Sequence, residues 1–374
     1  MRIALITIYH VPNYGSVLQA YATQELLEQL GHKCDVIKYR YPNEYHYSMG
    51  HPKQTLKQKI RSRIYYILGR NATARKNKNL DVFRNKCLNF TKEYSNLAKL
   101  KSEKWQNYDL FVVGSDQVWK SKYNYGDTAF LLSFVPNGKK RISIASSFAS
   151  STIPENMRER YKKHLAKFDA ISVRENNGAY IINKELSLDS KVSVILDPTL
   201  LLSKEEWLKK VPRSDFKKKK KYILLYMLTY AFEPRPYIFE VLKHLQTLDD
   251  YEIIALEGYT PAEKAEGVVM TDKTDASINE FIDLFANADI VVTSSFHGTA
   301  FAVNFGIPLI SIVPTDKGDD RQSTLLKNLN LHQCITPIGT DIKGLNPIYN
   351  KEQKDIELTN AREKSIEWII NNIN

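Results

Sequence analysis

Cysteine is scarce in this sequence of 374 residues, and its few positions exclude the usual cysteine chemistry. Only Cys34, Cys87 and Cys334 occur, and they lie far apart along the chain. No two of them have the close spacing that is typical of a zinc site or of a redox pair. Scattered thiols of this kind are typical of proteins in a reducing compartment.

Long apolar runs are also absent. Residues 1–8 are apolar too briefly for a secretory signal peptide and lack a cleavage-like site. No later apolar run approaches the length that spans a membrane. We therefore expect a cytoplasmic protein.

The motifs of dinucleotide and nucleic-acid binding are missing as well. No Gly-x-Gly-x-x-Gly follows the first apolar run, so a dinucleotide is not indicated. Neither a zinc-finger spacing nor an aromatic RNA-binding strand occurs, and the charge outside residues 53–78 is nearly balanced. We expect no nucleic-acid partner, although the sequence pI is about 9.2.

The positive charge is concentrated in one segment. The net charge is +11, and residues 53–78 contain nine Lys and Arg but no Asp or Glu. An apolar stripe in the same segment predicts a basic amphipathic helix, inserted at about 53–90. Such a helix packs on its own domain, which we favour, or makes peripheral contact with an anionic membrane at its inner face. The stripe consists of Leu56, Ile60, Ile64, Ile67 and Leu68.

Short apolar runs alternate with helical segments in both halves of the chain. This alternation predicts an α/β fold, with two parallel sheets that have helices on each face. Because the chain exceeds one typical domain, we predict two Rossmann-like domains, residues 1–212 and 213–374, with the ligand in the cleft between them. We assign acceptor binding to the first domain and anion binding to the second. Whether the last helix packs against the first domain is left open.

The most informative stretch is residues 290–308. Ile290–Val292 is a β-branched run that predicts a strand, and the hydroxyls of Thr293-Ser294-Ser295 indicate that a turn and a helix start follow. Gly306 is a helix stop before the next apolar run. The stretch therefore predicts a strand, a polar turn, a short helix and a second strand.

This junction is suited to bind an anion. The first amides of a helix point outward with partial positive charge, so a phosphate or carboxylate is stabilised there. Gly298 permits close approach of a ligand, and the adjacent His297 can titrate near neutral pH. The competing interpretation is an ordinary strand-helix unit with hydroxyl caps and a surface histidine.

Two strand ends in the first half carry candidate ligand contacts. The strand at 2–8 leads to a helix start at Asn13, Gly15 and Ser16, at the edge where open α/β sheets bind ligands. The strand at 108–113 leads to Asp116, which is a candidate base or sugar contact. In both places the alternative is a structural helix cap.

Two arginines are further candidates for contact with a ligand. Arg174 ends a predicted strand at 169–175, where it contacts a ligand anion, which we favour, or forms a structural ion pair. Arg321 precedes a helix predicted from Ser323, although a cation is unfavourable at a helix start. Its position indicates another purpose or a salt bridge to Asp319 or Asp320.

Five segments, in order, resemble the polysaccharide pyruvyl transferase family. They are Asn13–Tyr21, Gly114–Trp119, Ile171–Glu175, Leu196–Thr199 and Ser294–Gly298. The resemblance implies two domains similar to the glycosyltransferase-B architecture. It also implies phosphoenolpyruvate as the donor and a pair of sugar hydroxyls as the acceptor.

The resemblance also implies roles for single residues. His297 corresponds to a donor-binding histidine of the family, and Arg174 looks like a donor-binding arginine of the first domain. Ser295 departs from the family, which often has arginine there, and we hypothesise that Arg321 supplies the missing charge. The helix start would stabilise the departing phosphate through Ser294, Ser295, Gly298 and Thr299.

We expect His297 to act as the acid and Asp116 as the base or as the residue that orients the acceptor. The mechanism requires no metal and no cofactor besides the co-substrate. The predicted acceptor contacts are Asn13, Tyr14, Gly15, Ser16 and Gln117.

These inferences predict a pyruvyl transferase that acts on a cell-surface polysaccharide or its lipid-linked precursor. One alternative is a nucleotide-sugar-dependent glycosyltransferase, in which the helix start at 294–299 holds a diphosphate. Another is a non-catalytic protein that binds a sugar phosphate or a polyanion. Either enzyme loses rate in a His297→Ala variant, whereas a binding protein has no rate to lose.

Overall fold

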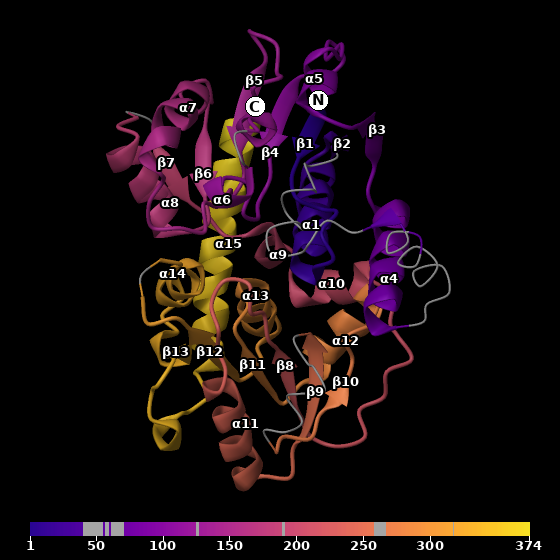
Figure 1. Cartoon of the computed structure of the whole chain (residues 1–374), viewed down its shortest axis with the longest axis vertical. Coiled ribbons are helices and arrows are strands. Elements are labelled where there is room, and N and C mark those ends of the chain that lie inside the picture. Colours follow the sequence, from indigo (N-terminus) through magenta and orange to yellow (C-terminus); the bar gives the residue numbers. More distant parts are fainter. Residues whose placement is uncertain are drawn as a thin grey trace. The chain divides into compact units, whose positions relative to one another are not determined.

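The computed structural model describes residues 1–39, 55, 56, 60, 71–124, 127–188, 191–257, 267–316 and 318–374 (Figure 1). The chain forms two compact units. Unit 1 comprises residues 1–68, 82–201 and 362–374, and unit 2 comprises residues 69–81 and 202–361. Of the predicted basic insertion at 53–90, residues 53, 54, 57–59 and 61–70 lie outside the described residues, and Ala72–Cys87 is a helix.

Unit 1 is built on a five-stranded parallel sheet with the order β3-β2-β1-β4-β5. A two-stranded parallel sheet, β6-β7, is joined to β5 and the loop after it by bridges from Ile142 to Ala170 and from Ser146 to Val173. The strands are β1 (Arg2–Ile6), β2 (Lys33–Tyr39), β3 (Phe90–Tyr94), β4 (Leu110–Val113), β5 (Lys140–Ser143), β6 (Ile171–Val173) and β7 (Val192–Val194). The helices are α1 (Tyr14–Gln29), α5 (Leu97–Lys101), α6 (Ser121–Asn124), α7 (Glu155–Leu165), α8 (Asn176–Tyr180) and α9 (Pro198–Leu201).

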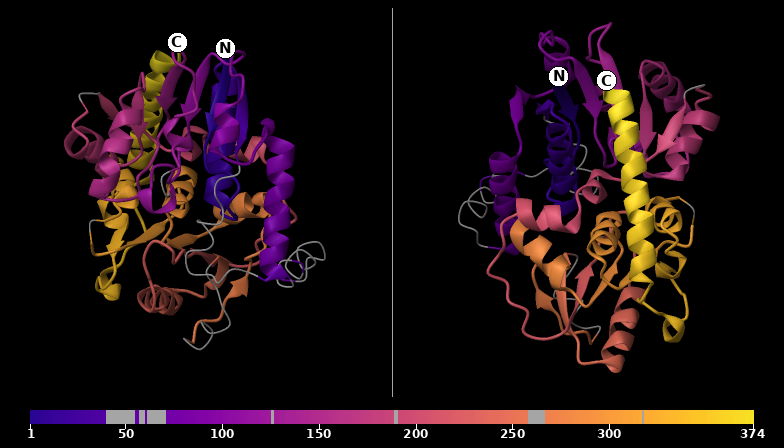
Figure 2. Two further views of the ribbon diagram at one scale, coloured as in Figure 1. Left: turned by 45° about the horizontal axis from the view of Figure 1, so that its top comes forward. Right: turned by 180° about the vertical axis from the view of Figure 1, so that it is seen from behind.

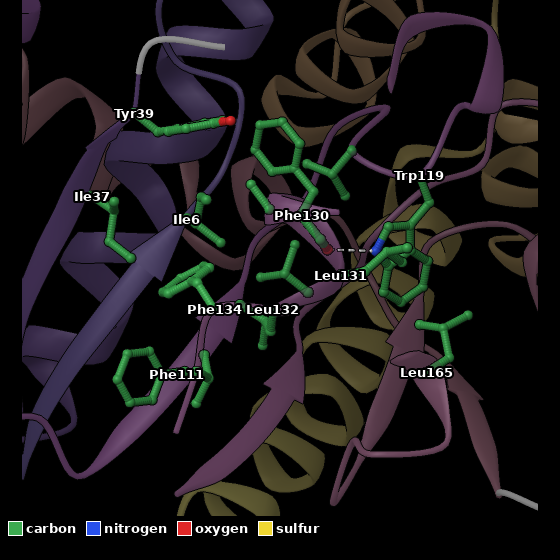
Figure 3. Packing of buried hydrophobic residues seen from close by; sticks show 14 of the residues in the cluster. Ile6, Ile37, Tyr39, Phe111, Trp119, Phe130, Leu131, Leu132, Phe134 and Leu165 are labelled. Atoms are coloured by element: carbon green, nitrogen blue, oxygen red, sulfur yellow. Dashed lines mark hydrogen bonds between the residues drawn. The ribbon is translucent and has the colours of Figure 1, made fainter. Parts of the chain in front are cut away.

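The core of unit 1 is apolar and rich in aromatic rings (Figure 3). Ile6, Ile37 and Phe111 extend from β1, β2 and β4 into one buried cluster. Trp119 belongs to the same cluster, and its indole Nε1 donates to the carbonyl of Phe130 at 2.9 Å. Because the central strands are buried on both faces, their sequences are short continuous apolar runs.

Unit 2 contains a six-stranded parallel sheet with the order β10-β9-β8-β11-β12-β13. Capping boxes at Ser203 and Ser277 fix the starts of two of its helices. The strands are β8 (Tyr222–Tyr226), β9 (Glu252–Glu257), β10 (Thr271–Asp272), β11 (Ile290–Thr293), β12 (Leu309–Val313) and β13 (Ile335–Pro337). The helices are α10 (Lys204–Lys210), α11 (Tyr237–Leu248), α12 (Ile278–Asn287), α13 (Phe296–Phe305) and α14 (Arg321–Asn328).

Two helices contribute residues to both units, namely α4 (Ala72–Cys87) and α15 (Lys351–Ile373). Figure 2 shows that α15 is one continuous helix. Its last part belongs to unit 1, where Ser365 Oγ accepts from the Leu196 amide at 3.1 Å. No helix among the described residues is long and apolar enough to cross a membrane.

The predicted fold class is confirmed, since both units are Rossmann-like and both main sheets are parallel. The apolar run at 268–270 predicts a short strand, but the ladder contains Thr271 and Asp272 instead. Val268 and Met270 are buried and Val269 is exposed, so an irregular segment imitates the alternation of a strand. The edge strands β3 and β13 were not predicted.

Candidate active site

The junction between β11 and α13 has the predicted order of strand, polar turn and helix. Ser295 is the N-cap of α13, and its Oγ accepts from the Gly298 amide at 3.3 Å. The helix ends at Gly306, whose φ of 70° is the left-handed conformation that glycine adopts most easily. The sequence therefore specifies both ends of this helix.

Two hydroxyl groups form hydrogen bonds from this junction to the neighbouring strand β8 and to Leu228, which follows it. Thr293 Oγ1 donates to the Tyr226 carbonyl at 2.6 Å and accepts from the Ser295 amide at 3.0 Å. Ser294 Oγ donates to the carbonyl of Leu228 at 2.9 Å and accepts from its amide at 2.8 Å. The side chains of Thr293 and Ser294 thus set the position at which α13 begins.

Gly298 is a glycine because α13 lies close to the sheet. A Cβ built on Gly298 would lie 2.2 Å from Thr293 Oγ1 and 3.0 Å from Thr293 Cβ, which no side chain can occupy. The close approach of a ligand, which the sequence suggested as the reason for this glycine, stays a prediction. Packing of the helix against β11 accounts for this residue.

His297 lies in the first turn of α13, and 6% of its surface is exposed. Its ring packs edge-on against Phe296, with 5.2 Å between the ring centroids. The imidazole thus stands beside the positive end of the helix dipole. An imidazole and the start of a helix are therefore adjacent in unit 2.

Arg321 begins α14 and is almost fully buried. Its Nε donates to Asp319 Oδ1 at 2.8 Å, which is one of the two salt bridges proposed from the sequence. The ion pair orients the guanidinium at a position where the helix dipole alone would disfavour it.

Thr299 lies one turn into α13, and its hydroxyl takes part in a buried polar cluster. Thr299 Oγ1 and Ser311 Oγ are 2.7 Å apart, and Gln322 Nε2 donates to both. The cluster connects α13, β12 and α14. Sequence analysis missed Gln322, because one glutamine near a helix start gives no signal of its contacts.

In unit 1, Asp116 follows β4 in an unusual backbone conformation. Its φ of 73° lies in the left-handed region, which residues other than glycine seldom adopt. Ser16 Oγ donates to Asp116 Oδ2 at 2.5 Å, and the Gln117 amide donates to Oδ1 at 2.8 Å. A constrained backbone of this kind is common at functional sites.

The start of α1 meets Asp116 at the same edge of the sheet. Asn13 is the N-cap of α1 and accepts from the Ser16 amide at 3.2 Å. Tyr14 and Gly15 form the buried first residues of this helix. The structure therefore brings Ser16, Asp116 and Gln117 together. Asn13 is connected to them through its hydrogen bond with the Ser16 amide.

Arg174 lies at the centre of a buried group of charges. Its Nη1 donates to Asp197 Oδ2 at 2.7 Å and to Ser115 Oγ at 3.2 Å. Its Nη2 lies 3.5 Å from Asp116 Oδ1, and none of the side chain is exposed. The ion-pair alternative is thus what the structure contains, and contact with a donor stays a prediction.

Glu175 is a second residue that sequence analysis left without a role. It is fully buried, and its Oε1 accepts from the amides of Phe148 and Ala149 at 2.8 and 3.3 Å. Ala145 and Ala149 in the same loop also have positive φ values. Glu175 therefore holds the loop after β5 in a strained conformation, and the only signal in the sequence was its position at a strand end.

The described residues contain no group of three or more His, Cys, Asp or Glu side chains arranged to hold a metal ion. The predicted residues instead form two groups of hydrogen-bonding side chains. Ser16, Asp116, Gln117 and Arg174 lie in unit 1, and Ser294 to Thr299 and Arg321 lie in unit 2. Hydroxyl, imidazole, guanidinium and carboxylate groups of this kind suit proton transfer and anion binding.

Solved structures with a similar fold include two epimerases. UDP-GlcNAc 2-epimerase from Neisseria meningitidis, bound to UDP-GlcNAc, is 11% identical, with 100% of this chain and 99% of that chain covered and a TM-score of 0.53. Another UDP-N-acetylglucosamine 2-epimerase is 10% identical, with 98% and 90% covered and a TM-score of 0.50. At such low identity the similarity concerns the fold alone, which resembles the glycosyltransferase-B architecture. No curated protein matches the sequence.

A family match covers most of the sequence. Residues 13–316 match the family described as polysaccharide pyruvyl transferase. This range begins at the cap of α1 and extends beyond α13 and β12, so it includes the surroundings of Asp116, Arg174 and His297. The chain therefore belongs to the polysaccharide pyruvyl transferase family and is an enzyme of that family.

Proposed function

We propose that this enzyme transfers pyruvate from phosphoenolpyruvate to two hydroxyl groups of one sugar, forming a pyruvate ketal. The sugar belongs to a cell-surface polysaccharide or to its lipid-linked precursor. Family membership over residues 13–316 supports the reaction class. The observation that carries the donor proposal is the Ser295-capped start of α13 with His297 in its first turn.

The reaction balances without an oxidant or reductant. The methylene carbon of phosphoenolpyruvate accepts a proton, and a sugar hydroxyl forms a C–O bond to the adjacent carbon. The C–O bond to phosphate then breaks, and a second hydroxyl closes the ketal. Of the two hydroxyl protons released, one replaces the proton used and the other leaves with phosphate.

In unit 2, His297 donates the proton to the methylene carbon. The amides at the start of α13 stabilise the phosphate, together with Ser294, Ser295, Gly298 and Thr299. Ser295 carries no charge, so Arg321 at the start of α14 supplies the cation that pairs with the phosphate. Its ion pair with Asp319 keeps the guanidinium oriented before the donor binds.

In unit 1, Asp116 accepts a proton from an acceptor hydroxyl or orients the acceptor. The hydroxyl of Ser16 and the amide of Gln117 hold its carboxylate in place. Asn13, Tyr14 and Gly15 form the adjacent helix start and contact the sugar. Arg174 binds the donor in addition to its pairing with Asp197.

The proposal includes no metal and no cofactor besides phosphoenolpyruvate. It also includes peripheral attachment to the inner face of a membrane through residues 53–78, because a basic segment is attracted to anionic lipid. Retention on anionic vesicles at low salt and release at high salt would support that attachment. Failure of the protein to bind such vesicles at low salt would remove this part of the proposal.

Calorimetric titration tests the donor. We expect the wild-type protein to bind phosphoenolpyruvate, and Arg321→Ala to bind it about tenfold or more weakly, because a charged hydrogen bond to phosphate is lost. UDP-sugars serve as the comparison ligands. Binding of a UDP-sugar without binding of phosphoenolpyruvate would overturn the proposal in favour of glycosyl transfer, and unchanged affinity of Arg321→Ala would remove the role of that arginine.

A further inference from the structure

We propose that Gln322 is a positioning residue of the donor site, where its side-chain amide fixes Arg321 relative to the start of α13. Gln322 itself does not touch the donor. This inference rests on the proposed function, in which Arg321 and the start of α13 bind the donor phosphate together.

The side chain of Gln322 is buried and reaches two other elements. Its Nε2 donates to Ser311 Oγ at 2.8 Å, to the Ile312 carbonyl at 3.2 Å and to Thr299 Oγ1 at 3.3 Å. Ser311 and Ile312 belong to β12, and Thr299 lies near the start of α13. One amide group therefore connects the start of α14 to β12 and to α13 by hydrogen bonds.

The members of this cluster are buried and are also hydrogen-bonded to one another. Thr299 Oγ1 and Ser311 Oγ are 2.7 Å apart, so the two hydroxyls that accept from Gln322 also bond to each other. None of the surface of Thr299 or Ser311 is exposed. A buried polar cluster with mutually supporting bonds holds its elements in one arrangement, because any shift leaves a polar group without its bond.

Arg321 immediately precedes Gln322 in the first turn of α14. Within this turn, Arg321 pairs with Asp319, and Thr324 Oγ1 donates to Asp320 Oδ2 at 2.9 Å. These two bonds stabilise the shape of the turn. From the same turn, the side-chain amide of Gln322 reaches α13.

Donor binding depends on that placement. Two groups that hold one phosphate must stand at matched distances from it, and the binding free energy falls when either is displaced. Removing the amide of Gln322 therefore weakens donor binding even though Arg321 and His297 are unchanged. Acceptor binding, assigned to unit 1, is not affected.

The test is a double-mutant cycle on phosphoenolpyruvate binding. Gln322→Met keeps the size of the side chain and removes the amide, and we expect roughly tenfold weaker binding. In the Arg321→Ala background the same substitution should have little further effect, because it acts through Arg321. The KM for phosphoenolpyruvate should rise, while the KM for the acceptor stays unchanged.

Thr324→Val is the matched control, since it removes a buried hydroxyl of α14 that donates to Asp320 in the same turn. We expect its donor affinity to equal that of the wild type. If Gln322→Met folds poorly, as judged by its thermal unfolding midpoint, Ser311→Ala removes one of the acceptors of Gln322 and should weaken donor binding in the same direction.

The outcomes separate the two proposals. A wild-type protein that does not bind phosphoenolpyruvate overturns the proposed donor and this inference with it. Wild-type binding with unchanged affinity in Gln322→Met overturns the inference alone. It is also overturned if the effects of Arg321→Ala and Gln322→Met add fully, or if Thr324→Val weakens binding as much as Gln322→Met does.

Discussion

Single residues at the strand ends of unit 1 are held by hydrogen bonds and ion pairs to side chains from other parts of the sequence. Arg174 pairs with Asp197, and Asp116 accepts from Ser16. Their positions at strand ends were predictable, because a short apolar run followed by polar residues indicates the edge of a sheet. Their partners were not, since which strand ends meet depends on sheet order.

The buried group around Arg174 predicts a large effect on stability. Arg174→Met should lower the free energy of unfolding by about 3–5 kcal/mol, because Asp197 and Asp116 then lose their buried cation. Urea denaturation measures this loss. Arg158→Met is the control, because its ion pair with Glu185 is partly exposed, and we expect a change of no more than about 1 kcal/mol. Equal losses in the two variants would contradict the assignment.

The role proposed for His297 predicts that its substitution lowers the catalytic rate and has little effect on folding. His297→Gln should lower kcat by roughly 10²–10⁴, because the side chain no longer donates a proton to the methylene carbon. Steady-state assays of phosphate release measure kcat. His332→Gln is the control, since His332 is exposed in the same unit and should not matter. A kcat within twofold of the wild type for His297→Gln would exclude its role as the acid.

At the scale of elements, the junction of β11 and α13 was the most predictable part of the chain. The β-branched strand, the hydroxyl turn and the terminal glycine each favour their structure through neighbours in the sequence. This junction could therefore be predicted from the sequence alone. The edge strands β3 and β13 are short and were missed, since their residues lack a distinct apolar run. The requirement for Gly298 was predicted, but its cause, contact with Thr293, needed the packing of helix on strand.

Gly298 therefore predicts a packing defect. Gly298→Ala should lower the free energy of unfolding by about 1–3 kcal/mol, because the new methyl group overlaps Thr293 and forces α13 away from β11. Thermal unfolding measures the loss. Gly344→Ala is the control, because a Cβ there meets nothing within 4 Å. If Gly298→Ala is as stable as Gly344→Ala, the packing argument fails.

At the scale of the whole molecule, the sequence predicted two Rossmann-like domains, and the structure has two such units. Alternation of strand and helix is a strong signal, because it recurs along the entire chain. The family was also accessible from five ordered segments, and the match over residues 13–316 establishes it. The acceptor sugar could not be predicted from the sequence, since its contacts depend on loops whose geometry no local pattern encodes.

The central claim is that this enzyme converts phosphoenolpyruvate and a sugar into a ketal. The most direct measurement is incubation of the purified protein with phosphoenolpyruvate and polysaccharide or lipid-linked fragments that lack pyruvate. We predict phosphate release that requires the acceptor, with a product heavier by one pyruvate less one water. Sugar transfer from a nucleotide-sugar, with phosphoenolpyruvate left intact over the same acceptors, would contradict the account.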